Sequence, residues 1–245
     1  MKRDPTDIRT LSVVMPVFNE AETLPLILER VLKASVNLDL EIVCVDDGSS
    51  DASSMVLDEW AERDPRIRVV RHATNRGKGA AVRTAIEHIT GDVAIIQDAD
   101  LEYDPADYAA VLGPILAGSA DVVYGSRFAG GAERRVQLFW HGLGNRILTM
   151  LANALNDLDL TDMETCYKAF RTDILTRLRL TASDFRIEPE ITSRLAGAKM
   201  RIYEVPVSYH GRTYSQGKKI RWTDGVLAVV ALFKYRFVDR EPYRS

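Results

Sequence analysis

Short apolar runs, rich in β-branched residues, recur along the first half of the chain and alternate with helical patterns. The runs are LSVVMPV (11–17), LEIVCVD (40–46), IRVVRH (67–72), DVAIIQD (92–98) and DVVYGS (121–126). Between the first two, residues 22–33 place apolar side chains on one face of a helix. Strands that alternate with helices predict an α/β fold, with a Rossmann-like, mostly parallel sheet and helices on both faces.

Composition excludes several classes of function. A formal net charge of -3 with 27% charged residues gives no basis for general nucleic-acid binding. The two cysteines form no CxxC pair and no HExxH is present, which argues against a zinc site. The polar N-terminus MKRDPTDIRT is unlike a signal peptide, so we expect a cytoplasmic protein.

The chain of 245 residues predicts one compact domain with a C-terminal elaboration. We expect a tail over residues 1–10, the main α/β domain over 11–215 and a basic, amphipathic segment over 216–245. The longest apolar run of that last segment, GVLAVVALF, has nine residues, whereas a membrane-spanning helix needs roughly 20. We therefore expect no transmembrane helix.

Polar residues gather where the predicted strands end. Ligands of open α/β sheets bind beyond the carboxyl ends of the strands, so these ends predict one shared site. After the fourth run come Asp98, Asp100, Glu102 and Asp104. In an extended chain Asp98 and Asp100 project to one face, and Glu102 joins them if the extension continues. Such oxygen donors suit Mg²⁺ or Mn²⁺ together with substrate phosphate, whereas Asp104 is expected only to cap a helix.

Three other strand ends carry candidate ligands. Asp46 and Asp47 follow the second strand and can accept hydrogen bonds from a nucleobase or a ribose. Lys78, in TNRGKGAA, precedes a helix and suits either a tight loop or a phosphate site. Arg127 ends the fifth strand, and a basic cluster with aromatic residues, containing Arg212 and Lys218, suits either a solvated face or anionic headgroups.

Taken in order, these motifs resemble those of the family 2 inverting glycosyltransferases of the polyprenyl-phosphate type, typified by dolichol-phosphate mannose synthase and dolichol-phosphate glucosyltransferase. The segments that carry the resemblance are VVMPVFNEAETL, VDDGSSD, NRGKGAAVRTA, QDADLEYDP, YGSRF, TDMETCYKAFR and GRTYSQGKK. The resemblance implies a GT-A fold, a UDP- or GDP-hexose donor, a polyprenyl-phosphate acceptor and Mg²⁺ or Mn²⁺ as cofactor.

The resemblance also assigns residues to the two substrates. The nucleotide sugar would be held by Pro16, Phe18, Glu20, Val45, Asp47, Lys78, Asp98, Ala99 and Asp100. The metal would be held by Asp98, Asp100 and Glu102, and the acceptor phosphate by Arg127, Arg146, Arg212 and Lys218. Asp100 and Arg127 would be the catalytic residues. Glu102 stands where mannose synthases typically carry glutamine, which distinguishes this metal site.

Two other functions fit the same motifs. A family 2 transferase that acts on a sugar hydroxyl would need a carboxylate base, for which Asp162, Glu164 and Glu190 are candidates. A noncatalytic nucleotide-sugar-binding protein would use the same scaffold without turnover. The sequence does not decide between a monomer and a homo-oligomer.

A polyprenyl acceptor would also require a membrane surface. The apolar residues after Arg135 (Leu138, Phe139, Trp140, Leu143, Ile147 and Leu151) and those near Trp222 can form interfacial helices, core helices or a dimer contact. The interfacial interpretation places the protein peripherally at the inner face of the cell membrane, with the basic run 218–221 near anionic lipid.

Overall fold

The computed structural model describes residues 8–131, 135–136, 138–212 and 222–243. Its sheet has seven strands in the order β3-β2-β1-β4-β6-β5-β7. The strands are β1 (Thr10–Val17), β2 (Asp39–Asp46), β3 (Ile67–Arg71), β4 (Val93–Ile96), β5 (Val122–Ser126), β6 (Lys168–Arg171) and β7 (Ile202–Pro206). All neighbours are parallel except β6, which runs antiparallel to β4 and β5.

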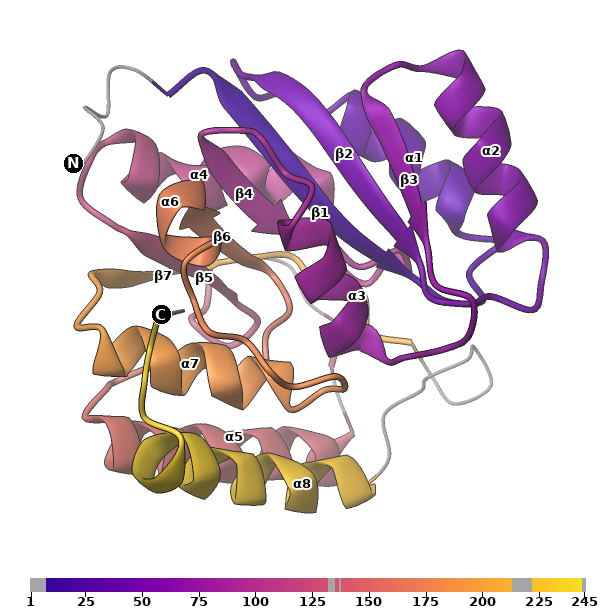
Figure 1. The fold of residues 1–245 in the computed structure, drawn as a ribbon. Helices are drawn as coiled ribbons and strands as arrows, with labels where there is room; N and C mark the ends of the chain where they lie inside the picture. Colours follow the sequence, from indigo (N-terminus) through magenta and orange to yellow (C-terminus); the bar gives the residue numbers. More distant parts are fainter. Residues whose placement is uncertain (1–7, 132–134, 137, 213–221, 244–245) are drawn as a thin grey trace.

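Helices cover both faces of this sheet and form a further layer beyond it (Figure 1). The α-helices are α1 (Leu24–Leu32), α2 (Ser53–Arg63), α3 (Lys78–Ile86), α4 (Tyr108–Leu116), α5 (Phe139–Asn156), α6 (Thr172–Leu175), α7 (Ile187–Gly197) and α8 (Trp222–Phe233). A short 3-10 helix, η2 (Pro105–Asp107), precedes α4, and a π-helical turn, η4 (Lys234–Val238), follows α8. The mostly parallel α/β sheet predicted from the sequence is thereby confirmed.

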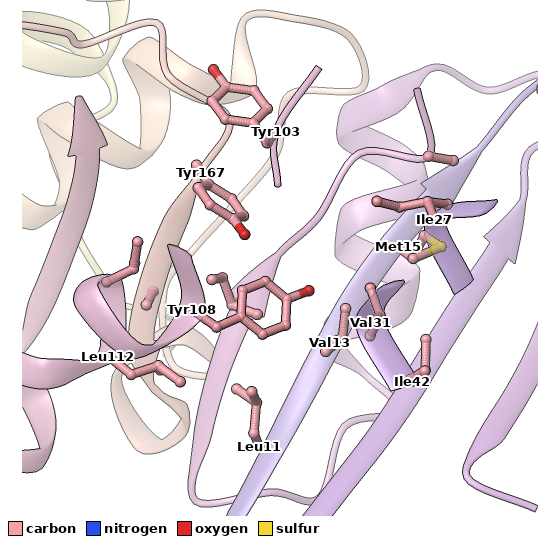
Figure 2. Packing of buried hydrophobic residues seen from close by; sticks show 14 of the residues in the cluster. Leu11, Val13, Met15, Ile27, Val31, Ile42, Tyr103, Tyr108, Leu112 and Tyr167 are labelled. Carbon is pink, nitrogen blue, oxygen red and sulfur yellow. The ribbon is translucent and has the colours of Figure 1, made fainter. Parts of the chain in front are cut away.

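Successive side chains of β1 point to opposite faces of the sheet, and the hydrophobic core has one half on each face. Leu11, Val13 and Met15 point into the cluster that contains α1, α2 and α4, whereas Val14 points into the cluster that contains α3, α6 and α7. Figure 2 shows the first cluster, in which the apolar faces of α1 and α4 meet β1. Side chains of both clusters are almost fully buried, as a sheet covered on both faces requires.

Three tyrosines join this core to the loop after β4. The Tyr103 and Tyr167 rings stack with centroids 5.0 Å apart, and Tyr108 packs against Tyr167 at 5.9 Å (Figure 2). Tyr103 follows Glu102 directly, so its burial anchors the carboxylate-rich loop to the hydrophobic core.

The C-terminal helix α8 packs on α5 and α7, and Figure 1 shows α7 between the sheet and this helix pair. The outer faces of α5 and α8 leave large apolar side chains exposed, among them Phe139, Trp140 and Phe233. Within the described ranges, no helix combines the length and the apolar content that crossing a bilayer requires.

Candidate active site

A cavity of about 350 Å³ lies at the carboxyl ends of the central strands. It brings together eleven of the fourteen residues predicted to form the site: Pro16, Phe18, Glu20, Asp47, Lys78, Asp98, Ala99, Asp100, Glu102, Arg127 and Arg212. Val45 does not line it, because its side chain is buried in the cluster on the α3 face. Arg146 lies exposed on α5 outside the cavity, and Lys218 lies outside the described residues.

The carboxylate loop after β4 turns instead of continuing the strand, so the prediction of an extended chain here is wrong. The strand ends at Ile96, and residues 99–102 form a turn and a bend. Leu101 has a φ of 63°, a left-handed conformation that is costly for a branched side chain. The turn sends Asp98, Asp100 and Glu102 to different partners.

Asp98 is paired with Lys78 at the start of α3. The Lys78 Nζ lies 2.7 and 2.8 Å from the two carboxylate oxygens, and it also donates to the Cys166 Sγ at 2.7 Å. Burial favours the neutral acid, but the charge of Lys78, hydrogen bonds from Cys166 and Lys78 and the charge of Lys168 together outweigh it, so the pKa of Asp98 lies below its ordinary value. Lys78 thus brings a buried positive charge to the cavity.

Gly77 makes this position of Lys78 possible. Its φ of 93° is one that favours glycine, and a Cβ here would collide with the carbonyl oxygen of Ser183. The N–H groups of Arg76 and Gly77 donate to the Asp47 carboxylate at 2.9 and 2.8 Å. Asp47 therefore lines the cavity and also holds the loop that carries Lys78.

Asp100 and Glu102 lie in different electrostatic surroundings. Burial, then the neighbouring Asp98 and Glu102 carboxylates, raise the pKa of Asp100 to about 7. Glu102 accepts from the Tyr209 hydroxyl at 2.9 Å and from the Arg212 backbone N–H at 2.6 Å. The crowding of negative charge around Asp100 is a setting that a divalent cation would relieve.

The carboxylate oxygens of this loop fit Mg²⁺ or Mn²⁺ that is held jointly with a diphosphate. Across the described part of the chain, no three His, Cys, Asp or Glu side chains form a cluster that could hold a metal alone. Magnesium, however, is commonly bound by one or two carboxylates with substrate phosphate oxygens completing the shell. Asp98 and Asp100 can supply such carboxylates.

Arg212 lies in the cavity wall and is paired with Glu20. Its Nη1 and Nη2 donate to the two Glu20 carboxylate oxygens at 3.1 and 2.8 Å, and its Nε donates to the Asp100 carbonyl at 2.8 Å. Thr23 also donates to Glu20 at 2.9 Å. The structure thus groups Arg212 with Glu20 and Asp100, and its contact with the acceptor phosphate stays a prediction.

Arg127 lies at another part of the cavity wall. Its Nε and Nη2 donate to the Asp162 carboxylate at 2.6 and 2.7 Å, so Nη1 is left outside the pair. Asn145 of α5 contacts both partners, at 3.3 Å from Arg127 and 3.2 Å from Asp162. The guanidinium also lies 5.1 Å from the centroid of the Tyr209 ring, which orients it toward the cavity.

The three candidate bases differ in their contacts. Asp162 is fully buried and occupied by Arg127. Glu190 is fully buried and accepts from Thr181, Ala182 and Arg194, so it stabilises the fold away from the cavity. Glu164 lines the cavity, and its Oε1 is buried without a hydrogen-bond partner among the described residues.

Sequence reasoning missed several lining residues: Val17, Asn75, Gly77, Ala81, Tyr103, Cys166, Asp184, Phe185 and Tyr209. The prediction of the site relied on polar residues that directly follow a predicted strand. Tyr103 and Cys166 lie within quoted motifs, so those motifs offered a signal for them. Asp184 and Phe185 precede a helix instead, and reach the cavity only through the fold.

Comparison with known sequences identifies the group of proteins that shares these motifs. Residues 12–179 match the family model described as "Glycosyl transferase family 2". A polyprenol monophosphomannose synthase of Mycolicibacterium smegmatis is 30% identical over 229 residues, covering 88% of this chain and 84% of the relative. A dolichol-phosphate mannosyltransferase of Pyrococcus furiosus is 29% identical over 210 residues, covering 85% of this chain and 58% of the relative.

Other relatives are longer than this chain. An undecaprenyl-phosphate 4-deoxy-4-formamido-L-arabinose transferase of Pectobacterium carotovorum is 34% identical over 176 residues, covering 70% of this chain and 52% of the relative. This chain thus spans between half and three fifths of the length of two of these relatives.

Solved structures share the fold. Glucosyl-3-phosphoglycerate synthase from Mycobacterium tuberculosis, in complex with Mg²⁺ and UDP, superposes with a TM-score of 0.72 at 19% identity, covering 93% of this chain and 79% of that one. The same synthase with Mn²⁺, UDP and glucosyl-3-phosphoglycerate gives a TM-score of 0.71. The predicted GT-A architecture is confirmed by these superpositions.

Proposed function

The chain belongs to glycosyl transferase family 2, and from this premise we propose that it transfers a sugar from a nucleotide-sugar donor to a polyprenyl monophosphate, with inversion at the anomeric carbon. One observation carries the proposal: the carboxylates of the Asp98–Glu102 loop and the guanidinium of Arg127 line the same cavity. A metal-bound diphosphate needs carboxylates, and an acceptor phosphate needs a cation.

The acceptor's own chemistry decides how much catalysis the protein must supply. A phosphate monoester has a second pKa of ~6, so a polyprenyl phosphate is largely dianionic at neutral pH and attacks without a general base. The protein must then position the phosphate and compensate its charge. Arg127, fixed by Asp162 and Asn145, would orient the attacking oxygen toward the anomeric carbon.

The departing nucleoside diphosphate requires compensation on the opposite side of the sugar. A divalent ion held by Asp98 and Asp100, with Glu102 beside them, would stabilise its developing negative charge when bound. Lys78 places a further cation there, 12% exposed and already paired with Asp98. Pro16, Phe18, Glu20 and Asp47 line the part of the cavity assigned to the nucleoside.

Tyr209 connects the two halves of the site. Its hydroxyl donates to Glu102 and its ring lies against the Arg127 guanidinium. Tyr209 therefore contacts residues assigned to both substrates.

The acceptor also indicates where the protein works. A polyprenyl tail remains in the bilayer, so the cavity must approach the headgroup plane. Leu138, Phe139 and Trp140 at the start of α5 are 65%, 71% and 76% exposed, as expected for an interfacial helix. Relatives named for dolichol, undecaprenyl and polyprenol phosphates support the same acceptor class. We assign the protein to the cytoplasmic face of the membrane, bound peripherally.

Transfer to a sugar hydroxyl is the second candidate, favoured by the unpartnered oxygen of Glu164, which could act as a base. An acceptor panel distinguishes the possibilities. The full chain is incubated with Mn²⁺, UDP-glucose or GDP-mannose, and a short-chain prenyl phosphate, the matching prenyl alcohol or a free sugar. We expect product only with the phosphate. Product with the free sugar favours the second candidate, and binding without turnover favours a noncatalytic protein.

A further inference from the structure

Glu164 lies in the turn that leads into β6, and two flanking residues fix that turn. The Met163 N–H donates to the Thr149 hydroxyl of α5 at 3.1 Å. The Thr165 hydroxyl donates to the Gly125 carbonyl at the end of β5 at 2.6 Å. Because both neighbours are held by buried hydrogen bonds, the backbone presents the Glu164 side chain to the cavity in a defined position.

Ion pairs between other residues surround this turn. Three pairs lie in or beside the cavity wall: Lys78 with Asp98, Arg127 with Asp162, and Lys168 with Glu188. Among the residues that the structure describes, Glu164 has no ion pair, and its buried Oε1 accepts no hydrogen bond. A buried polar atom without a partner is costly, and of the five such side-chain atoms among the described residues only Glu164 Oε1 belongs to a residue that lines the cavity.

The Lys168 and Arg127 cations already act on Glu164, so its surroundings suit a hydroxyl group better than a further cation. Burial, followed by the Glu188 carboxylate, raises the pKa of Glu164 to about 7, although Lys168 and Arg127 act in the opposite sense. The carboxyl group therefore exchanges between a form that only accepts and a form that can also donate. A hydroxyl both donates and accepts, so it can satisfy either form.

We propose that Glu164 is a specificity-determining residue that binds a hydroxyl group of the transferred sugar. This inference rests on the proposed function. The sugar must lie between the departing diphosphate and the attacking phosphate, and Glu164 shares the cavity with Asp98 of the first group and Arg127 of the second. A phosphate acceptor needs no base, so Glu164 remains available to the sugar.

A carboxyl group at this position predicts which nucleotide sugars the protein prefers. A site built around a carboxyl group rejects a sugar that lacks the matching hydroxyl, because the buried oxygen is then left without a partner. Replacing Glu164 should therefore weaken binding of the preferred nucleotide sugar while leaving binding of the bare nucleotide intact.

Calorimetric titrations test this on the full chain in Mg²⁺ with UDP, GDP, UDP-glucose and GDP-mannose, followed by deoxy analogues of whichever sugar binds best. For Glu164→Ala we expect nucleoside diphosphate affinity to stay within about twofold and nucleotide-sugar affinity to fall about tenfold or more. One deoxy analogue should bind the wild type about tenfold more weakly than the parent nucleotide sugar does, but should bind Glu164→Ala as tightly as the parent does. Glu62→Gln, at an exposed position of α2, controls for loss of a negative charge.

The outcomes separate this inference from the function on which it rests. A wild type that binds no nucleotide sugar overturns both. A wild type that binds normally, with the same sugar preference in Glu164→Ala, overturns the inference alone. Unchanged donor binding with turnover lost only toward a hydroxyl acceptor would make Glu164 a base and would also overturn it. Melting curves keep the result interpretable, because removal of an unpartnered carboxyl group should not lower Tm.

Discussion

The Arg127–Asp162 pair offers a quantitative test of how the proposed acceptor side is built. Asp162 is fully buried, and Arg127 is 12% exposed, so water can solvate neither charge well once the other is removed. Asp162→Asn keeps the shape of the side chain but removes its charge and turns an amide N–H₂ toward the guanidinium or the backbone. The mutation leaves a buried cation without its anion.

The expected cost follows from this burial. Breaking a buried ion pair by removing one partner costs about 3–5 kcal/mol, which for a chain of this size corresponds to a fall in Tm of roughly 6–20 °C. The exposed pair of Arg71 and Asp58 is the matched control, because its side chains are 43% and 60% exposed. Asp58→Asn should cost at most about 1 kcal/mol.

Thermal and chemical denaturation of the two variants provide the measurement. A double variant, Arg127→Met with Asp162→Asn, should be more stable than Asp162→Asn alone, because neither charge then remains buried. The reasoning is refuted if Asp162→Asn melts within about 3 °C of the wild type, or if the double variant is the less stable of the two.

Four further outcomes are expected. Asp100→Asn should lower turnover by about 100-fold or more with little loss of stability, and normal turnover of this variant or of wild type in excess chelator would exclude the metal assignment. Arg127→Ala should raise the KM for prenyl phosphate about tenfold while nucleoside diphosphate binding stays nearly constant, whereas equal loss of both would place Arg127 with the donor. Replacing Phe139 and Trp140 with serine should reduce co-sedimentation with anionic vesicles, and unchanged sedimentation would reject an interfacial α5. The pKa of Glu164 in the folded protein, about 7, exceeds its value of ~4.3 in the unfolded chain. Between these two pH values the folded state therefore binds more protons than the unfolded state does. Ionisation of the carboxyl group then lowers the stability of the protein as the pH rises. The free energy of unfolding of Glu164→Gln, relative to that of wild type, should then rise by on the order of 2–4 kcal/mol from pH 5 to pH 8. Denaturant titrations at the two pH values measure this difference, and an equal difference at both would contradict the raised pKa.

The parallel part of the fold was predictable because its strands are continuous β-branched runs bounded by polar turns. The first five runs correspond to β1 to β5. By contrast, β6 is the four-residue segment KAFR and β7 is IYEVP, and neither alternates clearly enough to indicate a strand. The antiparallel insertion of β6 between β4 and β5 depends on tertiary pairing, which local sequence does not report.

Much of the candidate site followed from one rule, that ligands bind beyond the carboxyl ends of strands. This rule brought Glu20, Asp98 and Arg127 together correctly in one cavity. It could not predict that Arg212 pairs with Glu20, because 192 positions separate them along the chain. It also could not reveal the unpartnered oxygen of Glu164, which is a property of the packed surroundings and not of the motif.

The most direct test of the proposed transfer is the stereochemistry and stoichiometry of a single product. The full chain, Mn²⁺, a short-chain prenyl phosphate and the preferred nucleotide sugar are combined, and the glycosyl phosphate is analysed by NMR while nucleoside diphosphate is quantified. One displacement by the acceptor phosphate predicts a product with inverted anomeric configuration, formed in equal amount with the nucleoside diphosphate. Retained configuration, or nucleoside diphosphate released without glycosyl phosphate, would contradict the account.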